Sequence, residues 1–123
     1  MNLVRVLLVD DQEAFMYALV AVVDATPGFV VVGQAATGEE SLELAAELRP
    51  GLVLMDVNLP GIDGIEATRR LRQNSPPPVV ILLSTHDEDA GELFVAQSGA
   101  SAYVTKSAFG PDRLARTWSS SQR

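Results

Sequence analysis

The chain of 123 residues has no cysteine, which excludes a disulfide framework and any metal site built on thiolates. It also has no long apolar run. The first such run, Leu3 to Val9, is far shorter than the roughly 20 residues needed to cross a bilayer. Asp10 and Asp11 close it at once, so it is not the core of a signal peptide. We therefore expect a protein of the reducing cytoplasm with no membrane partner.

Basic residues are scarce, and the formal net charge is −7. The densest basic group is Arg69, Arg70 and Arg72, and acidic residues flank it. Such a surface is poorly suited to a phosphate backbone, so we expect no direct nucleic-acid contact by this domain. Any DNA binding would need another domain or partner, and solubility alone also explains the charge. The glycine-rich motifs of dinucleotide-binding and P-loop proteins are absent from the sequence.

The pattern of hydrophobic residues predicts one globular domain of the α/β class. Short aliphatic runs alternate with amphipathic stretches, and this alternation favours a parallel sheet covered by helices on both faces. The expected strands are residues 4–9, 29–34, 52–56, 79–84 and 102–105. The expected helices are residues 12–25, 37–48, 65–72, 87–98 and 111–118. Thr37 and Glu40 form a capping-box pattern at the second helix, while Leu114 and Trp118 are expected to face the core from the last one.

Ligands of open parallel sheets bind at the carboxyl ends of the strands. The residues expected at this edge are Asp10 and Asp11, Asp56, Ser84 and Thr85, and Thr105 and Lys106. Two carboxylates about 4 Å apart repel by about 4 kcal/mol at an effective dielectric near 20, so the acids need counter-charge. Mg²⁺ prefers such oxygen ligands, and Lys106 is the only lysine of the chain. A carboxylate beside a metal ion and a lysine is equipped to accept a phosphoryl group as an acyl phosphate.

Four segments together resemble the pattern of response-regulator receiver domains, which act in two-component signalling. They are residues 9–11 (Val-Asp-Asp), 56–64 (Asp-Val-Asn-Leu-Pro-Gly-Ile-Asp-Gly), 83–86 (Leu-Ser-Thr-His) and 103–106 (Tyr-Val-Thr-Lys). They span almost the whole chain, in the order and spacing of that family. The resemblance implies the flavodoxin-like (βα)5 fold, a doubly wound parallel sheet with strand order 2-1-3-4-5.

The resemblance also implies roles for the acidic residues. Asp56 would be the phosphoacceptor and a ligand of Mg²⁺. Asp11 would bind the metal directly, with Asp10 beside it acting through water. Asn58 would contribute its backbone carbonyl to the same ion.

Three further residues would sense the phosphoryl group. Ser84 would hydrogen-bond one phosphoryl oxygen, and Lys106 would pair with another. Tyr103 would turn inward as Ser84 moves, so that Ser84 and Tyr103 form the switch. Such a switch needs only a small bias between two packed states.

The subgroup most similar to this chain is the receivers of LuxR/NarL-type regulators. Ser107 follows Lys106 where many receivers have proline, and residues 63–67 and 99–103 also resemble that subgroup. The resemblance implies a receiver domain over residues 1–123, either alone or as the N-terminal part of a longer regulator with a DNA-binding output domain.

The implied partner is a sensor histidine kinase. A homodimer would form on phosphorylation, through the fourth helix, fifth strand and fifth helix. The domain would assist its own phosphorylation and dephosphorylation without being an enzyme in the metabolic sense.

Single residues also allow simpler interpretations. Asp10 and Asp11 can merely cap the following helix, Lys106 can be solvated, and Tyr103 can be a fixed core aromatic. His86 is either an ordinary polar loop residue or, two residues past the predicted phosphoryl-binding serine, a residue that affects dephosphorylation.

Two alternative functions stay open. A Mg²⁺-dependent phosphohydrolase would use an aspartyl nucleophile, but it would place that nucleophile on the first strand with an acid two residues later. Here the acids of the first strand are adjacent. A pseudo-receiver, which only binds partners, usually lacks part of the acidic set that this chain retains.

Overall fold

The computed structural model describes residues 2–122, within which five strands and five α-helices alternate. The strands are β1 (Val4–Val9), β2 (Phe29–Ala35), β3 (Leu52–Asp56), β4 (Val79–Ser84) and β5 (Ala102–Thr105). The helices are α1 (Glu13–Asp24), α2 (Gly38–Leu48), α3 (Gly64–Leu71), α4 (Glu88–Ser98) and α5 (Pro111–Ser121). A short 3₁₀ turn, η1 (Lys106–Ala108), joins β5 to α5.

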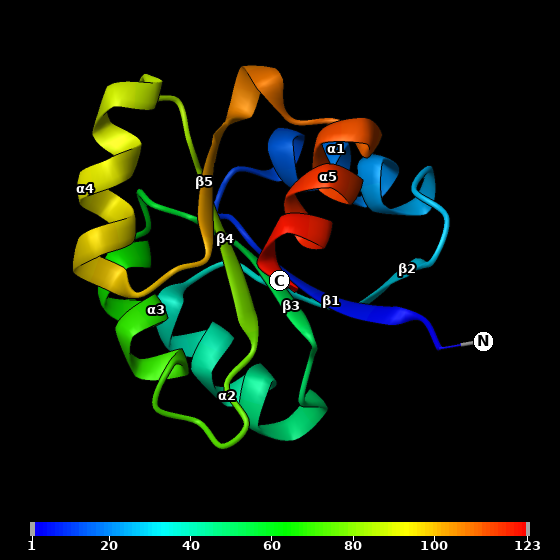
Figure 1. Ribbon diagram of the computed structural model, residues 1–123. Helices are drawn as coiled ribbons and strands as arrows, with labels where there is room; N and C mark the ends of the chain where they lie inside the picture. The colour runs from blue at the N-terminus through cyan, green and yellow to red at the C-terminus, as the bar shows by residue number, and fades with distance from the viewer. Residues whose placement is uncertain (1, 123) are drawn as a thin grey trace.

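The five strands form one parallel sheet in the order β2-β1-β3-β4-β5, which confirms the expected strand order. Helices α1 and α5 cover one face, and α2, α3 and α4 cover the other (Figure 1). Alternate residues of one strand therefore enter two different cores. In β1, Leu7 and Val9 pack toward α2 and α3, while Val6 and Leu8 pack toward α1 and α5. This explains why the central strands are almost continuously aliphatic.

Most helices begin where the sequence predicts, because a polar side chain caps them. The Thr37 hydroxyl accepts the N–H of Glu40 at 3.0 Å, as expected for α2. The Glu40 carboxylate accepts the N–H of Ala36 at 2.7 Å, one residue earlier than an ideal capping box would have it. Asp63 and Asp87 cap α3 and α4 in the same way.

The last helix is longer than predicted. It continues to Ser121 rather than ending at Trp118. Leu114 is fully buried, and Trp118 packs edge-on against Phe29 of β2 with ring centroids 6.1 Å apart. Both side chains face the core as expected, and the helix continues into the serines that follow Trp118.

None of the helices within residues 2–122 combines the length and the apolar character needed to span a membrane.

Candidate functional site

The carboxyl edge of the sheet brings three acids together. β1 and β3 are adjacent, so the residues that follow Val9 and Met55 meet at one edge. Carboxylate oxygens of Asp10, Asp11 and Asp56 lie within 4.8 Å of one another. The side chains of Asp10 and Asp56 are 0% and 4% exposed, whereas Asp11 is open to solvent. The cluster is thus buried on one side and accessible on the other.

The lysine expected at this edge reaches the same cluster. The Nζ atom of Lys106 lies 2.9 Å from Oδ2 of Asp10 and 3.5 Å from Oδ1 of Asp56, and its side chain is 10% exposed. On its other side the ammonium lies over the ring of Phe15, 4.3 Å from the centroid. Lys106 belongs to η1, directly after β5, so it extends across β4 to reach β1 and β3.

The pKa of Asp56 is raised from 3.8 to about 6. Burial is the main cause, and the neighbouring charge of Asp10 adds to it. The charge of Lys106 and the N–H of Asn58 only partly offset these effects. A carboxylate with such a pKa is held in a strained electrostatic environment, which is common where a group reacts or binds a ligand.

The donor set fits a divalent cation. Oδ1 of Asp10 accepts the N–H of Gln12 at 2.8 Å. Oδ2 of Asp10 is buried and forms an ion pair with the Lys106 ammonium at 2.9 Å. It has no hydrogen-bond partner. That oxygen therefore keeps a lone pair for another partner. Three carboxylates with one side open to water match the ligands and incomplete protein coordination that Mg²⁺ prefers.

The loop after β3 is tightly held behind these acids. A Cβ atom at Gly64 would overlap the main-chain carbonyl oxygen of Asp56, so only glycine allows α3 to start so close to the site. The N–H of Gly64 also donates to Val57 O at 2.8 Å. Across the loop, Glu39 of α2 accepts the N–H of Ile62 at 3.2 Å. Asn58 lies in this loop, and its carbonyl remains a predicted metal ligand.

A second group of residues joins the site to α4. Ser84 is fully buried at the end of β4, and its hydroxyl lies 2.8 Å from Nδ1 of His86. The Tyr103 hydroxyl donates to the carbonyl of His86 at 2.6 Å, and its ring packs against Phe94 with centroids 5.7 Å apart. A Cβ atom at Gly91 would overlap that ring, so the absence of a side chain at Gly91 leaves the space that Tyr103 occupies.

The sequence predicts the acids, the lysine and Ser84 at this edge, and the family resemblance adds Tyr103 as a switch residue. Three other residues that shape the site are not predicted. Phe15 is the first of them, and it lies in the helix predicted over residues 12–25. The only available signal for Phe15 was its place in the first turn after the paired acids. Gly91 stood out as a glycine inside a helical run, which often marks close packing. Glu39 had no distinguishing signal.

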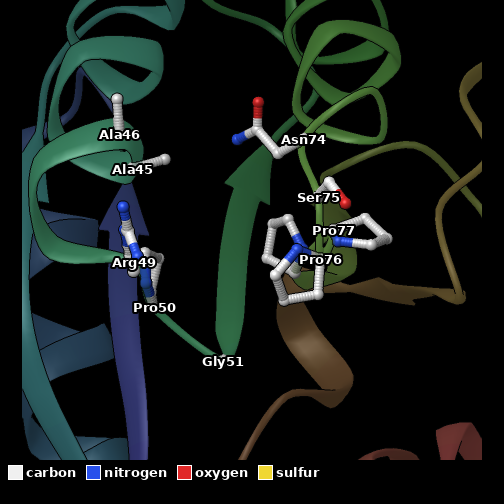
Figure 2. Close-up of a pocket in the computed structure, with 10 residues that line it drawn as sticks. Ala45, Ala46, Arg49, Pro50, Gly51, Asn74, Ser75, Pro76 and Pro77 are labelled. Atoms are coloured by element: carbon white, nitrogen blue, oxygen red, sulfur yellow. The ribbon is translucent and has the colours of Figure 1, made fainter.

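A cleft of about 530 Å³ lies at the opposite edge of the sheet, between the end of α2 and the loop that leads to β4 (Figure 2). Its lining residues are Ala45, Ala46, Arg49, Pro50, Gly51, Asn74, Ser75, Pro76, Pro77 and Pro78. Arg49 is the one titratable side chain among them. The three clustered acids and the lysine therefore lie at the carboxyl edge and not in this cleft.

The fold and the site define a doubly wound α/β domain with an acidic centre at its strand ends. Residues 6–118 match the family model described as the response regulator receiver domain. The chain belongs to this family and is a receiver domain of the two-component response-regulator type.

Curated relatives agree with this assignment. The response regulator GacA of Pseudomonas viridiflava is 43% identical over 106 residues, which are 86% of this chain and 50% of that protein. The transcriptional regulatory protein LiaR of Bacillus subtilis is 41% identical over 106 residues, 85% of this chain and 49% of that protein. The chain spans about half the length of these relatives.

Solved structures confirm the fold and the likeness to LuxR/NarL-type receivers. The signal receiver domain of the response regulator NarL from Mycobacterium tuberculosis has a TM-score of 0.86 and 28% identity, covering 99% of this chain and 98% of that one. A LuxR-family regulator from Aurantimonas sp. SI85-9A1 has a TM-score of 0.83 and 36% identity, covering 94% of this chain and 81% of that one.

Proposed function

We propose that the domain accepts a phosphoryl group on Asp56 from a sensor histidine kinase, with Mg²⁺, and in response changes its binding to partners. The observation that supports this most directly is the cluster of Asp10, Asp11, Asp56 and Lys106 at the carboxyl edge. It combines a buried carboxylate, a place for a cation and a fixed ammonium, which are the parts that phosphoryl transfer to a carboxylate needs.

In the proposed reaction an oxygen of Asp56 attacks the phosphorus of a phosphohistidine on the kinase. The new O–P bond forms as the N–P bond breaks, and the electron pair of that bond stays on the imidazole. Asp56 must be ionised to attack, and its pKa of about 6 means that it is mostly ionised above neutral pH. Asp10, Asp11 and Asp56, with the Asn58 carbonyl, would hold Mg²⁺. When bound, the ion supplies positive charge that favours ionised Asp56 and neutralises phosphoryl oxygens.

The switch residues would respond to the new anion. Lys106 would turn from Asp10 and Asp56 to a phosphoryl oxygen. The Ser84 hydroxyl would leave Nδ1 of His86, 2.8 Å away, and donate to another phosphoryl oxygen. Because the Tyr103 hydroxyl is bonded to the carbonyl of His86, a shift of Ser84 and His86 would be felt by Tyr103. The His86 side chain, so close to Ser84, would also affect the rate of dephosphorylation.

The consequence of the switch would be assembly and gene control. On this proposal the phosphorylated domain dimerises through α4, β5 and α5 in the cytoplasm. Residues 1–123 would be the receiver part of a regulator whose output domain contacts DNA. The receiver itself would touch no nucleic acid and would turn over no metabolic substrate. The relative LiaR, named as a transcriptional regulatory protein, supports this assignment, and the region that matches this chain is about half of its length.

The test is the intact mass of the protein after incubation with Mg²⁺ and acetyl phosphate. We expect a gain of one phosphoryl group, lost in Asp56→Asn and retained in Asp63→Asn. Asp63→Asn is the matched control because it makes the same chemical change at an exposed residue that caps α3. Sustained hydrolysis of a phosphate ester would instead favour the phosphohydrolase alternative.

If no mass is gained, a Mg²⁺ titration separates the remaining explanations. Binding of the metal would indicate a receiver that accepts only from its own kinase. Absence of both metal binding and phosphoryl uptake would contradict the proposal and favour a pure binding module.

A further inference from the structure

Lys106 has a contact that the proposed chemistry does not use. Its ammonium lies over the face of Phe15, 4.3 Å from the ring centroid. The lysine side chain is nine-tenths buried, so water only weakly competes for the charge. A cation over an aromatic face is attracted by the ring quadrupole, and the attraction grows as the cation is desolvated.

The other two contacts of Lys106 are with residues that the proposed function gives to the metal. They are the ion pairs with Asp10 and Asp56. A divalent cation among these carboxylates would neutralise the charge that now attracts the ammonium, and it would repel the ammonium as a like charge. The two ion pairs would thus weaken when the lysine is needed for the phosphoryl group.

The contact with Phe15 would not weaken in this way. The ring has no formal charge and no atom that ligates a hard cation. It is also fixed in place, because Phe15 packs against the core between the sheet and helices α1 and α5. The start of α1 is in turn tied to the site by the hydrogen bond from Gln12 N–H to Asp10.

We propose that Phe15 is a positioning residue that keeps the Lys106 ammonium at the carboxyl edge while a divalent cation occupies the carboxylates. The inference rests on the proposed function for the reaction that Lys106 serves. The contact itself is present in the unphosphorylated domain, so it can be tested without any phosphoryl transfer.

Lys106 is the only lysine of the chain, and this allows a direct readout. Protein labelled with ¹³C at lysine Cε gives one Lys106 signal by NMR, and protons held over a ring face are shifted upfield. We expect an upfield shift in the native protein that persists when Mg²⁺ alone is added. Phe15→Tyr should keep it. Phe15→Leu should lose the upfield shift. When Mg²⁺ is added, the Lys106 signal of this variant should move to the position of a free lysine.

The second readout is the rate of phosphoryl uptake from acetyl phosphate. At saturating Mg²⁺, Phe15→Leu should lower this rate about tenfold, the scale of a desolvated cation–π contact, and Phe15→Tyr should restore it. The matched control is Phe29→Leu, because Phe29 is a half-buried phenylalanine of the same core whose ring packs on Trp118 instead.

The two readouts keep this inference separate from the proposed function. If Mg²⁺ abolishes the upfield shift in the native protein, or if Phe15→Leu responds to Mg²⁺ as the native protein does, the role of Phe15 is refuted. Equal loss of rate in Phe15→Leu and Phe29→Leu would refute it as well. If the native protein takes up no phosphoryl group at all, the proposed function is in question, and the NMR signals alone still decide the role of Phe15.

Discussion

Two groups of charged residues in this domain have similar ion-pair distances, but the pKa of the carboxylate is lowered in one group and raised in the other. On α3, Glu66 lies 2.9 Å from Arg69 and 2.9 Å from Arg70. At the sheet edge, Lys106 lies 2.9 Å from Asp10 and 3.5 Å from Asp56. Hydrogen bonds from Arg70 and then Arg69 lower the pKa of Glu66, whereas burial and Asp10 raise the pKa of Asp56 to about 6.

The difference shows that distance alone does not make an ion pair favourable. Glu66 is exposed to water and has two cations for one anion, so its charge is satisfied. The buried group has two anions for one cation, with a third carboxylate beside it. Burying charge without balance costs stability, and such sites are kept where a ligand supplies the missing charge. The edge cluster therefore has unbalanced negative charge, whereas the single anion of the α3 group is fully paired.

Removing the single cation should have the largest effect. Lys106→Met leaves two buried carboxylates unpaired, so we expect a loss of about 3–5 kcal/mol in the free energy of unfolding near pH 8. The loss should be smaller near pH 5, where protonated Asp56 needs no partner. Urea unfolding followed by the fluorescence of Trp118, the only tryptophan, measures it. Equal losses at both pH values would contradict the charge argument, and Arg69→Met on α3 is the matched control.

Removing one anion should instead increase the free energy of unfolding. A pKa raised from 3.8 to about 6 means that ionising Asp56 costs the folded state about 3 kcal/mol, at about 1.4 kcal/mol per pKa unit. Between these pH values the folded protein binds more protons than the unfolded chain, so stability falls as pH rises. Asp56→Asn should therefore stabilise the domain by up to about 3 kcal/mol at pH 8. The gain should shrink toward zero as pH falls from about 6 to 4 in the same urea experiment.

The buried cluster was predictable from the sequence because topology fixes it. Parallel strands end at one edge, so a strand-end acid or lysine must come near the others whatever its side-chain rotamer. For this reason the meeting of Asp10, Asp11, Asp56 and Lys106 at one edge could be predicted from the strand pattern. The strand order and the family were instead implied by the resemblance of four segments to receiver domains. The roles assigned to these residues remain predictions.

The surroundings of the cluster were not predictable in the same way. Whether the ring of Phe15 meets Lys106 depends on how α1 packs beside η1, which the sequence pattern does not show. The position of the Tyr103 ring depends on the absence of a side chain at Gly91. The hydrogen bond of the Ser84 hydroxyl depends on the rotamer of His86. These contacts join residues distant in sequence or depend on side-chain torsions, and neither leaves a periodic pattern.

Supplying the missing charge should give a moderate effect. At ten times its dissociation constant, Mg²⁺ should stabilise the native domain by about 1.4 kcal/mol. The gain should be smaller at pH 5, where protons compete for the carboxylates, and a chelator should reverse it. Urea midpoints with and without the metal measure the effect. It should be strongly reduced in Asp11→Asn and unchanged in Asp63→Asn, and an equal gain in both variants would indicate unspecific binding.

Breaking the exposed group on α3 should have the smallest effect. Glu66→Gln removes the anion between Arg69 and Arg70, yet water and salt already screen all three charges. Because the pKa of Glu66 is lowered in the folded state, any contribution is present above the unfolded pKa and is lost as pH falls through the lower folded pKa. We expect the urea midpoint at pH 7 to stay within experimental error and the native and variant curves to coincide at pH 4. A loss comparable to that of Lys106→Met would show that proximity of charges, and not burial, governs both groups.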